Sequence, residues 1–156
     1  MGNLSTALLC TIFVLTLARL GETLRRNELL KKQENRPLWS RQAVIHQYMG
    51  IGYYRYWVER VYDRISDFLP HGILLHPEDH FVNEYLIHEG ELLDILRHFY
   101  KEKWGFPLTN EIKLEAEEWG ANLYNFEGFL KYLHYKQYAN PSDHIGEMYH
   151  LTMEEF

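Results

Sequence analysis

The sequence predicts an all-α protein: one N-terminal transmembrane helix that continues as a long helix, followed by a small domain of three to five helices. An uncharged apolar run lies near the N-terminus, and apolar residues recur at helical spacing along most of the remaining chain. No stretch shows the strict alternation that is typical of a half-buried strand. We therefore divide the chain into residues 1–37, an anchor with its helical extension, and residues 38–156, an aromatic-rich helical domain.

Leu4–Leu20 is the candidate membrane span. It has no proline or glycine, and its first charged residue is Arg19. Its length as a helix is about 26 Å, at the short limit for a hydrocarbon core of about 30 Å. Arg19 can extend its long side chain so that the guanidinium reaches the headgroups. Threonine hydroxyls within the run can bond to carbonyls one turn back, so we expect them to be tolerated in lipid.

Three other interpretations of this segment stay open at this point. A cleaved signal peptide would use Thr16 and Ala18 as the small residues before the cut, although no Lys or Arg precedes the apolar run. The first six residues also fit the short pattern for N-myristoylation at Gly2. The third interpretation is a buried core helix of a soluble protein. We favour a helix that spans the membrane once.

Charge is distributed unevenly along the chain. Residues 19–41 contain seven basic and three acidic residues, whereas residues 42–156 contain nine basic and nineteen acidic ones. A basic collar next to an apolar helix is attracted to an anionic membrane surface. By the positive-inside rule it places the C-terminal part in the cytoplasm, a mitochondrial matrix or a stroma. An acidic domain repels phosphate backbones, which argues against nucleic acid as a partner.

Turn and cap residues divide the rest of the chain into helices. The first helix extends to about Asn35, because the residue before Pro37 leaves helical geometry. We then expect a second helix from Ser40, as N-cap, to Pro70, with an interruption at Gly50-Ile51-Gly52. A third helix should run from Pro77 to Gly105. A fourth should run from Thr109 to Asn140-Pro141, where Gly120 or Gly128 can split it, and a short helical turn should follow at Asp143–Leu151.

The segment from His76 to His88 is the best candidate for metal chemistry. On the expected third helix, His80, Glu84 and His88 would project from one face at positions i, i+4 and i+8. Zinc sites use histidine pairs at i, i+4. The span from His80 to His88 would be about 12 Å, however, which is too long for one ion to bind both. A solvated polar face explains the pattern better.

Other motifs give weaker signals. Glu147-Met148-Tyr149-His150 is a single ExxH, whereas di-iron bundles need two. The single cysteine, Cys10, lies in the apolar run. The chain has no nucleophile elbow, phosphate-binding loop or dinucleotide fingerprint. The sequence therefore predicts no catalytic, cofactor-binding or metal-ligating residue. The acidic cluster, which comprises Glu111, Glu115, Glu117 and Glu118, is expected to be a solvated helical face or a dock for a basic partner.

Aromatic residues make up 15% of the chain, more than a small helical domain easily buries, and Tyr, Trp and Phe are enriched at interfaces. In outline the chain resembles the supernumerary single-span subunits of mitochondrial inner-membrane assemblies, the respiratory complexes and ATP synthase. That resemblance is architectural and rests on no diagnostic motif. It implies a non-catalytic structural subunit whose partners are lipid and other subunits, with its C-terminal domain in the matrix. The alternatives are a membrane-anchored metal-binding protein or enzyme that uses the His76–His88 segment, and a membrane-tethered adaptor with an acidic docking domain.

Overall fold

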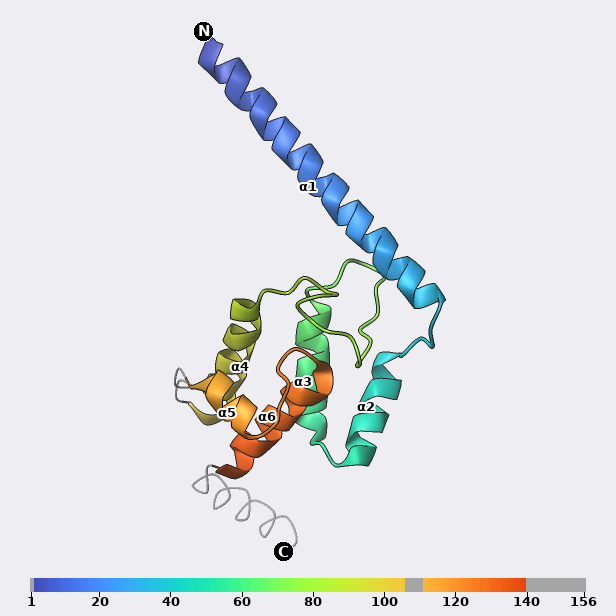
Figure 1. The fold of residues 1–156 in the computed structure, drawn as a ribbon, viewed down its shortest axis with the longest axis vertical. Coiled ribbons are helices and arrows are strands. Elements are labelled where there is room, and N and C mark those ends of the chain that lie inside the picture. Colours follow the sequence, from blue (N-terminus) through green and yellow to red (C-terminus); the bar gives the residue numbers. More distant parts are fainter. Residues whose placement is uncertain (1, 106–110, 140–156) are drawn as a thin grey trace, which may run out of the picture. The chain divides into compact units, whose positions relative to one another are not determined.

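The computed structural model describes residues 2–105 and 111–139, with side chains from residue 6 onward. Every regular element in these ranges is a helix, which confirms the predicted all-α fold class (Figure 1). The chain forms two compact units. The first comprises residues 1–38 and 69–74, and the second comprises residues 39–68 and the chain from residue 75 onward.

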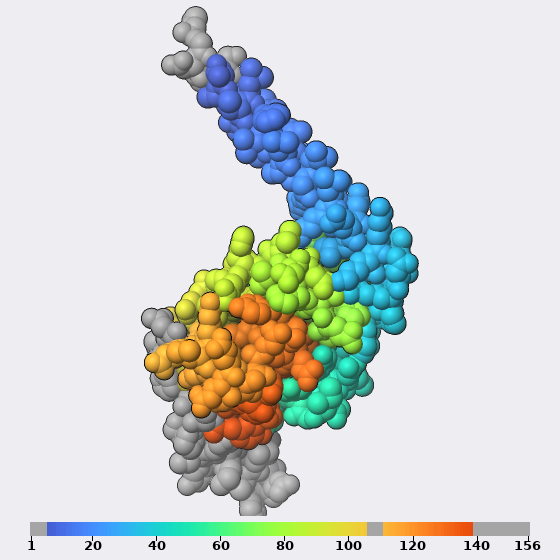
Figure 2. All heavy atoms as spheres, in the orientation of Figure 1, coloured from blue at the N-terminus to red at the C-terminus, as the bar shows by residue number. Residues whose placement is uncertain are grey.

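Helix α1, Gly2–Glu34, is continuous and agrees closely with the predicted first helix. The part from Thr6 to Glu34 is long and apolar enough to cross a membrane. Its apolar side chains are exposed, with Leu8 and Phe13 each 64% accessible, and Figure 2 shows this stretch of the chain in blue. The hydroxyl of Thr11 donates to the carbonyl of Ala7 at 2.9 Å, so this polar group is satisfied inside the helix as expected.

Segment 69–74 belongs to the same unit as the C-terminal part of α1. The Nε of Arg26 donates to the His71 carbonyl at 3.2 Å. The side-chain amide of the buried Gln33 donates to the Leu74 carbonyl at 2.9 Å. These two bonds, seven residues apart on α1, hold the short segment along one face of the helix.

The second predicted helix is interrupted where its glycines indicated. Helix α2, Arg41–Ile51, begins after Ser40, whose hydroxyl accepts a hydrogen bond from the Ala43 amide at 3.2 Å. It ends at Gly52, which has a φ of 111° that disfavours any residue with a Cβ. Helix α3, Arg55–Ser66, follows at once. The predicted N-cap and the glycine interruption are both confirmed.

The predicted start of the third helix at Pro77 is wrong. Helix α4 comprises only Glu89–Trp104, and residues 75–88 form an irregular segment with turns. Its backbone amides bond outside a helical ladder: Phe81 donates to the Tyr124 carbonyl at 2.7 Å, and Ile87 donates to the Phe81 carbonyl at 3.1 Å. Phe81 and Ile87 are buried. Tertiary burial of these side chains therefore overrides the helical pattern.

The fourth predicted helix divides into α5, Ile112–Glu118, and α6, Phe126–Ala139. Of the two glycines proposed to split it, Gly120 lies in the connection with a φ of 60°, whereas Gly128 lies inside α6. Leu114 in α5 is 67% exposed. Several predicted features fall outside the described residues, namely Pro107, Thr109, Asn140-Pro141, the turn at Asp143–Leu151 and the ExxH at Glu147–His150.

Helix α3 lies at the centre of the second unit, where it contacts α2 and α6. Its Trp57 is 2% exposed, and the indole Nε1 donates to the Gln137 side-chain oxygen at 2.9 Å, which satisfies both buried groups. Much of the aromatic content lies in this core. Buried rings include Tyr48, Trp57, Tyr62, Phe81, Tyr85, Phe99, Phe126, Phe129 and Tyr132.

Two helical glycines provide a matched test of this packing. A Cβ at Gly128 would collide with the backbone of Asn122, whereas a Cβ at Gly50 in α2 meets nothing within 4 Å. We expect Gly128→Ala to lower the free energy of unfolding by about 3 kcal/mol, because main chain has to move. Gly50→Ala should raise it by about 0.5–1 kcal/mol through higher helix propensity. Urea unfolding of the full chain in detergent measures both; equal effects would contradict the packing.

Candidate functional site

The His76–His88 segment does not form the helical face that its spacing indicated. His80 stacks on Tyr124, with ring centroids 5.2 Å apart and planes at 15°. The amide of His88 donates to the Glu91 carboxylate at 2.8 Å at the start of α4. Within the described residues, no group of three or more His, Cys, Asp or Glu side chains is placed to hold a metal ion.

A buried polar pair instead organises this segment. The carboxylate of Asp79 is 2% exposed and accepts the Tyr85 hydroxyl proton at 2.7 Å. The same hydroxyl oxygen accepts a hydrogen bond from the His76 amide at 2.8 Å. Such satisfied buried bonds fix the course of an irregular segment. The segment thus has a structural role that neither the metal pattern nor the helical pattern indicated.

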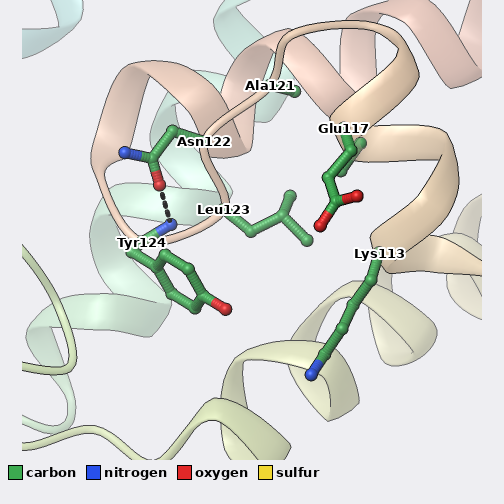
Figure 3. Close-up of a pocket in the computed structure, with 7 residues that line it drawn as sticks. Lys113, Glu117, Ala121, Asn122, Leu123 and Tyr124 are labelled. Carbon is green, nitrogen blue, oxygen red and sulfur yellow. Dashed lines mark hydrogen bonds between the residues drawn. The ribbon is translucent and has the colours of Figure 1, made fainter.

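A small pocket of about 190 Å³ lies between α5 and the segment that leads into α6, and Figure 3 shows its lining residues. Two of its lining residues contact the Glu89 carboxylate: the ammonium of Lys113 at 2.5 Å and the hydroxyl of Tyr124 at 2.6 Å. These two contacts, with Lys113 first, lower the pKa of Glu89. The charges of Lys113 and Glu89 are therefore paired with each other. These contacts link α4, α5 and the segment that leads into α6.

The predicted solvated acidic cluster is only partly exposed. Glu115 turns inward and accepts hydrogen bonds from the Tyr132 hydroxyl at 2.8 Å and from the Lys136 ammonium at 2.7 Å. Burial, followed by the bond to Glu115, raises the pKa of Tyr132. Glu115 therefore joins α5 to α6, and the expectation of a uniformly solvated face is wrong for this residue.

The described part of the chain gathers exposed aromatic side chains where the α2–α3 turn meets α6. We call this the aromatic surface, and it comprises Ile51, Tyr53, Tyr54, His134, Tyr135 and Tyr138. Its exposed members include Ile51 at 58% and Tyr138 at 48% accessibility. The Tyr54 and Tyr138 hydroxyls are 2.9 Å apart and share a hydrogen bond. A shallow pocket of about 200 Å³ opens within this surface.

His134 lies at the centre of the aromatic surface. Its ring contacts Tyr53, Tyr54 and Tyr138, with centroid separations of 5.8, 5.9 and 4.8 Å. Its Nδ1 is buried and has no hydrogen-bond partner within the described chain. Burial lowers the pKa of the imidazole. His134 is thus surrounded by half-exposed tyrosines, a composition that is typical of protein interaction surfaces.

Sequence reasoning indicated that aromatic interfaces exist but did not find this one. Tyr53 and Tyr54 follow the glycine turn, whereas His134, Tyr135 and Tyr138 lie more than 75 positions later. Their proximity depends on how α3 packs against α6. The local signal that could have helped is the pair of adjacent tyrosines directly after Gly52, a turn position where large rings are not expected in a core.

Comparison with protein families, curated proteins and solved structures gives no match for this chain.

The partly buried imidazole of His134 predicts that acid destabilises the protein. Its folded-state pKa lies below the ordinary value of about 6.5. The stabilising contribution is therefore complete above pH 6.5 and is lost as the pH falls through the folded pKa. The urea concentration at the midpoint of unfolding should fall between pH 7.5 and pH 5 in the wild-type protein. We expect this fall to be smaller in His134→Gln. His98→Gln, at an exposed histidine in α4, is the control. A full acid response in His134→Gln would contradict the assignment.

Proposed function

We propose that this protein is a non-catalytic, single-span accessory subunit of a larger membrane complex, in which α1 anchors it and the aromatic surface contacts a neighbouring subunit. The observation that carries the proposal is the uncovered apolar surface of α1. None of the candidate span is buried within the protein. An apolar surface of this extent marks a membrane or protein interaction site.

The exposure of α1 argues against the interpretation of a buried core helix. A core helix would bury its apolar side chains, whereas Leu9, Ile12 and Val14 are 64, 52 and 62% exposed. The side chains are exposed all round rather than along one stripe, as expected for a helix in lipid. The hydroxyl of Thr16 bonds to the Ile12 carbonyl at 2.8 Å, which lowers the cost of placing it in hydrocarbon.

The aromatic surface supports a protein partner. Tyrosine contributes a large rigid contact area with few rotatable bonds, and it is enriched among residues that dominate binding energy. The rings of Tyr54 and Tyr138 contact each other and His134, so they are ordered before binding. Ordered side chains lose less entropy on association. This arrangement favours a lasting subunit contact.

The polar clusters support a non-catalytic role. Active sites hold charged groups whose pKa is perturbed and whose reactive atoms are open to substrate. Here each of the carboxylates of Glu89 and Glu115 is bound by the ammonium of a lysine and the hydroxyl of a tyrosine of the same chain. The contacts of these carboxylates link different helices, so their role is structural.

For location, we propose the mitochondrial inner membrane with the C-terminal domain in the matrix. The excess of basic residues directly after the span supports this orientation through the positive-inside rule. The architectural resemblance to accessory subunits of respiratory complexes and ATP synthase supports the organelle.

Membrane insertion is tested by a charge at the centre of the span. We expect Ile12→Arg to add about 2.5–3.5 kcal/mol to the cost of insertion. The protein should then move from the membrane pellet to the soluble fraction on alkaline carbonate extraction. Ile12→Leu, which keeps the residue apolar, should stay in the pellet. If the arginine variant also resists extraction, α1 is held by something other than lipid insertion.

Subunit contact is tested by truncating the aromatic surface. We expect the double variant Ile51→Ala, Tyr135→Ala to weaken association with the complex by about 2–4 kcal/mol. Its co-purifying proteins in mild detergent should disappear from native gels, while the anchor stays in the membrane. Leu114→Ala, at an equally exposed leucine in α5, is the matched control. A wild-type protein that runs as a monodisperse monomer without partners would contradict the proposed function.

A further inference from the structure

The segment beside the exit of the candidate span contains a β-turn with a defined type. The amide of Ile73 donates to the Pro70 carbonyl at 3.0 Å, which closes a four-residue turn over His71 and Gly72. Gly72 has a φ of 85°. A positive φ at the third turn position is the signature of a type II turn, which glycine favours. This turn type sets the direction of the His71 carbonyl.

That carbonyl orients an arginine on α1. It accepts the Nε proton of Arg26 at 3.2 Å, which fixes the plane of the guanidinium. The two terminal Nη groups are then the remaining hydrogen-bond donors of the Arg26 guanidinium. Arg26 is exposed and forms no ion pair with a carboxylate of the described chain. It is therefore an exposed arginine whose Nε is held by the main chain of the turn, with its Nη2 next to Gly72.

The position of Arg26 along α1 matches the depth of a lipid headgroup. It lies six residues beyond Leu20, or about 9 Å along the axis. Each headgroup layer is about 5–7 Å thick. Helical side chains point toward the N-terminal end, so Arg26 reaches back toward the membrane. Arg19 lies seven residues earlier on the same face, with Glu22 between them.

We propose that Arg26, oriented by the Pro70–Ile73 turn, and Arg19 bind the phosphate of an anionic phospholipid headgroup. This inference rests on the proposed spanning helix. Guanidinium groups bind phosphate through paired hydrogen bonds. The net positive charge of residues 19–41 favours anionic over zwitterionic lipids.

The test uses the full chain in phosphatidylcholine nanodiscs that contain phosphatidylglycerol. After extraction in mild detergent, quantitative mass spectrometry measures the phosphatidylglycerol retained per protein relative to phosphatidylcholine. The wild-type protein should enrich phosphatidylglycerol, and Arg26→Gln should reduce that enrichment about fivefold. Arg97→Gln, which removes the same charge from α4, should leave it unchanged.

Gly72→Ala separates orientation from charge. It keeps every cation, but alanine is strained at this φ, so the turn should change type and redirect the His71 carbonyl. Enrichment should fall toward that of Arg26→Gln; wild-type enrichment in Gly72→Ala would overturn the role of the turn. Equal enrichment in Arg26→Gln and Arg97→Gln, with all proteins incorporated, would overturn the headgroup site. Failure of the wild-type protein to incorporate would instead overturn the spanning helix.

Discussion

The uncovered apolar surface of α1 is the constraint on which the rest of this protein depends. Eight large apolar side chains between Leu8 and Leu20 are more than half exposed. Leaving them in water costs on the order of 10 kcal/mol, which is comparable to the whole stability of a typical domain. The hydroxyls of Thr11 and Thr16 donate to the carbonyls of Ala7 and Ile12, one turn back, so these polar groups are satisfied within the helix. By length and composition this helix can span a membrane, and lipid would then cover its apolar side chains over the full circumference.

The sequence predicts the helices whose boundaries depend on local chemistry. The N-cap at Ser40 and the break at Gly52 follow from side-chain and backbone preferences that act within a few residues. The apolar spacing predicts a helix from Pro77, whereas residues 77–88 are irregular. Their actual course is set by partners far along the chain, such as the Tyr124 carbonyl that accepts from the Phe81 amide. Periodicity carries no information about such contacts.

The same distinction applies to the candidate sites. Composition indicated an aromatic surplus, yet it did not separate the buried rings from the exposed ones. Burial of Trp57 depends on Gln137, 80 positions away, which accepts its indole proton. The aromatic surface likewise joins Tyr54 to Tyr138 across 84 positions. Local sequence gives the number of rings, and the packing of α3 on α6 decides which of them stay exposed.

The hydrogen-bonded carboxylates inside the second unit indicate a rigid domain. Glu115 accepts hydrogen bonds from Tyr132 and Lys136, and Asp79 accepts one from Tyr85, so each of these carboxylates has a donor from the same chain. A group engaged in this way contributes rigidity, and removing one partner leaves a costly unsatisfied charge. Rigid domains present preformed surfaces and lose little entropy on association. A domain fixed internally by such ties presents its exposed tyrosines, Tyr54, Tyr135 and Tyr138, on a preformed surface, and this rigidity supports the proposed role as a non-catalytic subunit.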